Sequence, residues 1–284
     1  MTQRIENTSG EMAESDRRQF QYTHRMLVLY FALTFVITWG ILIPVLSAVP
    51  EDSQTLFFIP AAFGPFLSAV ITIWISKGRA ELRHWLRKVF RLGIPVILYL
   101  AGAFFLPFVI GVLHYGLYRV LGGEPDFSTA LSWYLYPENL LLVALLLGGN
   151  EEPGWRGFAL PALLERFHPL LAAIVLGVIH SAWHLPLLSQ YGTTFGWYLF
   201  NLIPLTVVLN WFYLKSRRSV IPVMLLHAST NVIDNFVPTP MVVLGGFGTG
   251  WFLRSLVYWA MAIVLVILTK GRLGCETTDT SLAV

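Results

Sequence analysis

The stretch MLVLYFALTFVITWGILIPVLSAV at 26–49 runs for 24 positions without a charged residue. About 20 apolar residues are enough for a helix to cross the hydrocarbon core of a bilayer. The length and uniform apolarity of this stretch therefore predict a transmembrane helix. The fold class then depends on how many other segments of the chain share this character.

Seven more segments are similarly apolar and nearly as long. Together with the first they give eight predicted transmembrane helices, at 26–49, 56–75, 94–117, 139–164, 170–188, 195–214, 220–236 and 251–269. The segment 139–164 is the weakest of the eight, because charged residues interrupt its middle. The predicted fold class is an all-α polytopic membrane protein with eight transmembrane helices and a polar site inside the membrane.

The composition of the whole chain agrees with this prediction. Only 12% of its 284 residues are charged and 56% are hydrophobic, whereas soluble domains carry about 25% charged residues. An ordinary cytosolic globule, a disordered chain and a nucleic-acid-binding protein are thereby excluded, although the pI is near 9.0. The single cysteine, Cys275, excludes a disulfide framework and a cysteine-based zinc site.

The basic residues predict the orientation of the helices. Sixteen of the nineteen Lys and Arg residues fall in the two tails and the even-numbered loops, and Arg119 alone falls in the odd-numbered loops. This alternation is typical of eight spans with both termini in the cytoplasm. We therefore expect cytoplasmic tails at 1–25 and 271–284 around a membrane domain at 26–270. The polar N-terminal tail does not read as a signal peptide.

The fourth segment carries EEPGWR, with Glu151 and Glu152 close to the predicted mid-depth of the membrane. Arg156 lies one helical turn after Glu152, so these two side chains are expected to pair. Pro153 is expected to disturb the helix. One arginine cannot neutralise both carboxylates, and an unpaired buried carboxylate is a candidate general base or acid. Buried ionisable groups in lipid mark either function or paired structure.

The fifth and seventh segments carry HSAWHLP and HASTN. His180 and His184 are four residues apart, the spacing at which two helical histidines can bind one metal ion; packing or a supporting role is equally open for His180. His227 and Asn231 are also one turn apart. An asparagine amide can donate to an oxyanion, orient a histidine, or simply link two helices.

Two further charged residues in the membrane, Asp234 and Arg254, lie at the same predicted depth near the outer ends of the seventh and eighth segments. They are expected to form a structural ion pair without a chemical role.

The order EExxxR, a second-helix histidine and then HxxxN resembles the CPBP intramembrane protease family, which includes type II CAAX prenyl endopeptidases and bacterial Abi proteins. The resemblance covers 139–236. It matches six positions to the family motifs: Glu151, Glu152, Arg156, His184, His227 and Asn231. His180 departs from the pattern, because the family usually has phenylalanine there.

The resemblance implies an intramembrane endopeptidase in a prokaryotic cell membrane, acting on a membrane-embedded or lipidated substrate such as a prenylated CAAX peptide. Glu151 with His184 would activate a water, His227 with Asn231 would hold the oxyanion, and Arg156 would fix the two glutamates. A zinc ion held by Glu151, His184 and His227, with His180 as an additional ligand, stays open beside a metal-free mechanism. So do two other functions: a non-catalytic scaffold or bacteriocin-immunity protein, and a metal or solute transporter.

Overall fold

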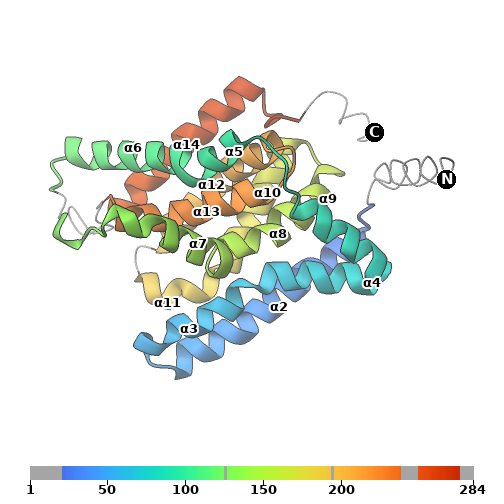
Figure 1. Cartoon of the computed structure of the whole chain (residues 1–284). Helices are drawn as coiled ribbons and strands as arrows, with labels where there is room; N and C mark the ends of the chain where they lie inside the picture. The colour runs from blue at the N-terminus through green and yellow to red at the C-terminus, as the bar shows by residue number, and fades with distance from the viewer. Residues whose placement is uncertain (1–20, 125–126, 193–194, 238–248, 276–284) are drawn as a thin grey trace.

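The structure is a computed structural model that describes residues 21–124, 127–192, 195–237 and 249–275. The described residues form helices joined by short turns, with no β-strand among them (Figure 1). Residues 1–20 of the predicted N-terminal tail and 276–284 of the predicted C-terminal tail lie outside the described ranges. The all-helical part of the predicted fold class is confirmed.

Five helical segments within the described ranges are long and apolar enough to cross a membrane: His24–Ala48, Leu56–Val89, Val96–Val120, Phe195–Lys215 and Gly250–Thr269. They coincide with the first, second, third, sixth and eighth predicted spans. Large apolar side chains such as Val36, Trp74 and Ile267 are exposed on their outer faces. That pattern suits contact with lipid rather than water. The full count of eight spans stays a prediction.

The N-terminal part of the fold is a layer of three helices, α2, α3 and α4, which lie together along one side of the molecule (Figure 1). Helix α2 covers His24–Ala48, and the Thr23 side chain caps its start by accepting a hydrogen bond from the amide of Met26. Helices α3 and α4 cover Glu51–Ala62 and Gly64–Val89. Helix α4 is kinked at Gly78, whose φ is 83°.

The remaining long helices form the rest of the bundle. Helices α5 (Val96–Leu100) and α6 (Leu106–Val120) are joined by a π-helical turn, η1 (Ala101–Phe105). Helix α12 (Phe195–Lys215) packs between α10 (Pro169–Trp183) and α14 (Thr249–Thr269).

The three predicted spans that carry the polar motifs are short or broken. In the fifth, α10 ends at Trp183, just before Pro186, and is followed by η6 (Leu185–Leu187) and α11 (Leu188–Tyr191). In the seventh, α13 (Ile221–Val232) is followed by η8 (Ile233–Asn235).

The fourth predicted span is not one helix, and its break does not lie at Pro153. Helix α7 (Tyr136–Leu146) ends before Leu147 (φ −144°) and Gly148 (φ 124°). The chain then resumes as η4 (Gly149–Glu151), α8 (Glu152–Gly154), η5 (Trp155–Ala159) and α9 (Leu160–Leu164). Pro153 instead occupies the first turn of α8, where a proline costs no helical hydrogen bond. The two glutamates therefore sit at the start of a helical segment.

The segment from α8 to α9 runs through the centre of the protein, and every residue from Glu151 to Leu160 is buried. Phe158 packs against Tyr30 of α2, with ring centroids 4.7 Å apart. A Cβ on Gly154 would lie 2.4 Å from the carbonyl oxygen of Pro65, so only glycine lets α8 approach α4 this closely. Residues of this segment, among them Trp155, Phe158 and Leu160, thus belong to the main hydrophobic core of the described residues.

Candidate active site

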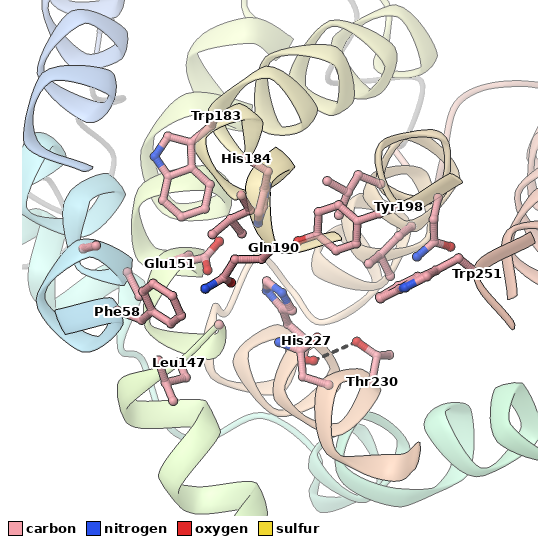
Figure 2. Close-up of a pocket in the computed structure, with 18 of the residues that line it drawn as sticks. Phe58, Leu147, Glu151, Trp183, His184, Gln190, Tyr198, His227, Thr230 and Trp251 are labelled. Carbon is pink, nitrogen blue, oxygen red and sulfur yellow. Dashed lines mark hydrogen bonds between the residues drawn. The ribbon is translucent and has the colours of Figure 1, made fainter. Parts of the chain in front are cut away.

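A cavity of about 470 Å³ opens between α2, α3, α10, α12, α13 and α14. Four residues of the predicted site line it: Glu151, His184, His227 and Asn231. Figure 2 shows the first three converging from separate helical segments onto the same space. The other predicted residues, Glu152, Arg156 and His180, are buried behind this wall. The structure thus brings the three motifs together and divides them into a lining layer and a supporting layer.

Glu151 is held through one of its two carboxylate oxygens. Its Oε2 accepts a hydrogen bond from the indole of Trp155 at 3.2 Å and lies 3.3 Å from Nε2 of His180. Neither contact involves Oε1. The carboxylate is therefore oriented by two aromatic rings while its second oxygen is left for a molecule in the cavity.

His184 has a defined hydrogen-bonding state. Its Nδ1 lies 2.9 Å from the carbonyl oxygen of His180. A carbonyl can only accept, so Nδ1 must donate, and Nε2 of the neutral ring carries the lone pair. The imidazole also packs against the rings of Trp183 and Tyr198. His184 can therefore take a proton at Nε2 without turning its ring.

Behind the lining lies a buried charged cluster built on Glu152. Its Oε1 accepts from Arg156 at 2.9 Å and lies 2.6 Å from Nδ1 of His227. Both Glu152 and Arg156 have no exposed side-chain surface, and the Nε–H of Arg156 donates to Oδ1 of Asn210 at 3.0 Å. The predicted Glu152–Arg156 pair is confirmed. The carboxylate that was expected to lie outside this pair is Glu151, which contacts Trp155 and His180 instead of Arg156.

Asn231 follows His227 by one turn of α13, and the unusual backbone of Gly148 faces both. A Cβ on Gly148 would lie 2.5 Å from Nδ2 of Asn231 and 3.5 Å from Nε2 of His227. The φ of 124° is also one that residues with side chains rarely adopt. Gly148 therefore lets the break in the fourth predicted span approach the HxxxN motif closely.

The described residues contain no group of three or more His, Cys, Asp or Glu side chains arranged to hold a metal ion. His180 and one oxygen of Glu151 face each other, while His184 and His227 each offer a single ring nitrogen to the cavity. The geometry therefore gives no support to a preformed zinc site of Glu151, His184, His227 and His180.

The predicted Asp234–Arg254 ion pair is present, and Arg254 also donates to the carbonyl oxygen of Thr230. The sequence prediction did not place this pair in the site, yet both residues line the cavity. Gly148, Trp155, Asn201 and Asn210 were missed as well. The signals available for them were the unusual Gly-Gly pair before the glutamates and two isolated asparagines in the otherwise apolar segment 195–214.

Residues 132–233 match the family model described as "Type II CAAX prenyl endopeptidase Rce1-like". The chain is also 28% identical over 223 residues to the "CAAX prenyl protease 2" of Methanococcus maripaludis, covering 72% of this chain and 82% of that relative. All six motif residues fall within the matched segment, whereas Asp234 and Arg254 lie beyond it.

Proposed function

The chain belongs to the CAAX prenyl endopeptidase-like proteases through residues 132–233, and on this premise we propose that it cleaves a prenylated CAAX-type peptide inside the membrane with a water activated by Glu151 and His184. The cleaved bond would follow the prenylated cysteine, and the product would be the C-terminal tripeptide. The observation that carries the proposal is the convergence of Glu151, His184 and His227 on one cavity.

In the proposed first step, a water between Glu151 and His184 adds through its oxygen to the scissile carbonyl carbon. Its proton passes to the Glu151 carboxylate, whose Oε1 is not engaged by Trp155 or His180. The lone pair of Nε2 of His184 accepts the second hydrogen bond of this water. A general base within hydrogen-bonding reach of its proton typically contributes about 10²- to 10⁴-fold in rate.

In the proposed second step, the negative charge on the former carbonyl oxygen is stabilised by Nε2–H of His227 and the amide of Asn231. Because Nδ1 of His227 faces the Glu152 carboxylate at 2.6 Å, a ring that also donates from Nε2 carries two protons. Before the water adds, the charges of Glu151, Glu152, Arg156 and an imidazolium at His227 cancel, and after it adds the charge of the oxyanion replaces that of the protonated Glu151. Collapse of the intermediate breaks the C–N bond, and the proton held by Glu151 passes to the leaving amine.

The role proposed for Glu152 and Arg156 is to position His227 rather than to touch the substrate. Neither side chain has exposed surface. Apart from contacting each other, Glu152 contacts His227 and Arg156 contacts Asn210. A bound divalent metal would supply Lewis-acid polarisation of the carbonyl. The three-ligand set it needs is not assembled, so no step here is assigned to it.

The same proposal includes the finer topology. We propose eight crossings of a prokaryotic cell membrane with both termini in the cytoplasm, on the basis of the distribution of Lys and Arg. The single cysteine, Cys275, offers a direct test. A membrane-impermeant thiol reagent should label it only after the cells are opened. Labelling in intact cells would contradict a cytoplasmic C-terminus.

The activity itself is tested with purified protein in proteoliposomes. We expect a farnesylated peptide ending in a three-residue extension to lose that tripeptide, as measured by mass spectrometry, while its unprenylated twin is cleaved much more slowly. An intact farnesylated peptide after prolonged incubation would refute the proposal. In cells, rescue of a deletion phenotype by the Glu151→Gln protein would favour the non-catalytic alternative instead.

A further inference from the structure

The cavity has two unlike halves on either side of Glu151, His184 and His227. Figure 2 shows Phe58 and Leu147 on one side of this centre and Tyr198 and Trp251 on the other. The first half is lined mainly by small and apolar side chains of α2 and α3, namely Thr38, Leu42, Phe58, Ala61 and Ala62. The second half, called the polar half below, is built by α12, α13, η8 and α14. Tyr198, Leu202, Leu205 and Trp251 line it together with the polar residues Asn201, Thr230, Asn231, Asp234, Asn235 and Arg254.

Arg254 is the only Lys or Arg among the described residues that line the cavity. The residue is 5% exposed. It is fixed by Asp234, by the carbonyl oxygen of Thr230 and by the rings of Trp251 and Tyr258, whose centroids lie 5.7 and 5.8 Å from its Cζ. A guanidinium has five N–H donors in a rigid fork that suits a carboxylate. Among the described residues, the contacts to Asp234 and Thr230 use NH1 and NH2 once each and Tyr258 is a further partner, which leaves other N–H groups of the guanidinium for a ligand.

The polar half also contains a buried acceptor without a partner. Asn201 of α12 is 3% exposed and lines the cavity, and its Oδ1 has no hydrogen-bond partner among the described residues. A buried polar atom left unpaired loses its hydration without compensation. A peptide lying along this wall would supply the missing N–H donor. Asn231 and Asn235 line the cavity as well.

The spacing between the reacting centre and the ion pair matches a short peptide. Asp234 follows His227 by seven residues along α13 and η8, which corresponds to about 10 Å at 1.5 Å per helical residue. Three residues of extended chain also span about 10 Å. A tripeptide that begins at the scissile bond and runs into the polar half would therefore end beside Asp234 and Arg254.

We propose that Arg254 binds the free C-terminal carboxylate of the substrate and so fixes cleavage three residues from the chain end. This inference rests on the proposed endopeptidase function. Asp234 holds the guanidinium in place when the cavity is empty, and Asn201 binds the backbone of the segment that leaves. The apolar half then receives the lipidated residue on the other side of the scissile bond.

The test compares two farnesylated peptides of the same sequence, one ending in a carboxylate and the other in a carboxamide. A hydrogen bond to a charged group contributes enough that the carboxamide should lower kcat/KM by about 10- to 100-fold. Peptides with two or four residues after the farnesylated cysteine should likewise be cleaved at least tenfold more slowly than the peptide with three. Equal rates for carboxylate and carboxamide in the unaltered protein would overturn the carboxylate site.

Variants separate this role from a structural one. Arg254→Gln should lower kcat/KM for the carboxylate peptide to the level of the carboxamide peptide, which should hardly change. The double variant Asp234→Asn/Arg254→Gln removes both charges and guards against misfolding caused by an unpaired aspartate. Asn201→Leu should slow both peptides by the same factor. A preference for the carboxylate that survives in both arginine variants would overturn the assignment.

The two proposals fail in different ways. If the unaltered protein cleaves neither peptide, the endopeptidase function itself is wrong, and this inference falls with it. If it cleaves both peptides equally, the function stands and only the anchor at Arg254 is lost.

Discussion

Nδ1 of His227 lies 2.6 Å from Oε1 of Glu152, the same oxygen that accepts the 2.9 Å hydrogen bond from Arg156. One buried carboxylate oxygen thus joins the EExxxR motif to the HxxxN motif across two helical segments. The second oxygen of Glu152 has no partner among the described residues. The position of His227 in the cavity therefore depends on a residue that does not itself line it.

Glu152→Gln should weaken both folding and catalysis. The substitution leaves Arg156 without a buried countercharge, and breaking a buried ion pair by removing one partner typically costs about 3–5 kcal/mol. We expect a lower unfolding temperature in detergent and a kcat reduced by about 100-fold, because His227 loses its orientation. Unchanged stability together with unchanged kcat would contradict the role given to Glu152.

Gly148→Ala should impair activity through the backbone. The methyl group would meet Nδ2 of Asn231 at 2.5 Å, and alanine is strained at a φ of 124°. We predict a kcat lower by about 100-fold, the effect of losing one oxyanion donor. Gly116→Ala in α6 is the matched control, since nothing lies within 4 Å of a Cβ there. The prediction is wrong if both variants keep full activity.

Trp155→Phe tests how Glu151 is oriented. The indole N–H donates to Oε2 of Glu151 at 3.2 Å, and phenylalanine removes this donor while keeping an aromatic ring. Loss of one hydrogen bond to a carboxylate should lower kcat about tenfold or more. Trp259→Phe serves as the control, because its indole N–H has no partner among the described residues. Equal effects of the two substitutions on kcat would speak against the orienting role.

Removal of metal ions should leave the activity unchanged. The described part of the chain assembles no three-ligand group, and the proposed water is held by Glu151 and His184 alone. Activity of the purified protein should therefore survive treatment with a strong chelator, with less than one equivalent of zinc by elemental analysis. A loss of activity on chelation that zinc restores would require a metal-bound water instead.

Two ion pairs of the site could be predicted from the sequence, one from helical spacing and one from matching depth in the membrane. Glu152 and Arg156 were expected to pair because they are one turn apart, and the pair is present. The Asp234–Arg254 pair was likewise expected from matching depth in two apolar segments, and it is also present. In both cases lipid-like surroundings leave a charged group few alternatives to its nearest counterion.

Features that depend on backbone geometry or on packing between distant helices could not be read from the sequence in this way. Hydropathy contains no information about backbone torsion angles. The sequence therefore did not predict that the helix breaks at Leu147 and Gly148, and the disturbance was expected at Pro153 instead. Asn201 and Asn210 stand alone in an apolar segment, and their roles arise only from how α12 packs. The site is built where the fourth, fifth and seventh predicted spans are short or broken helices instead of continuous ones.

Water activation by Glu151 is tested by the kcat of the Glu151→Gln protein on a farnesylated peptide, with thermal unfolding followed in parallel. Glutamine keeps the shape of the side chain and removes its capacity to take a proton. We predict that kcat falls by at least about 100-fold, while the unfolding temperature stays within a few degrees of the unaltered protein. A folded Glu151→Gln protein that retains activity within a few-fold would contradict water activation by Glu151.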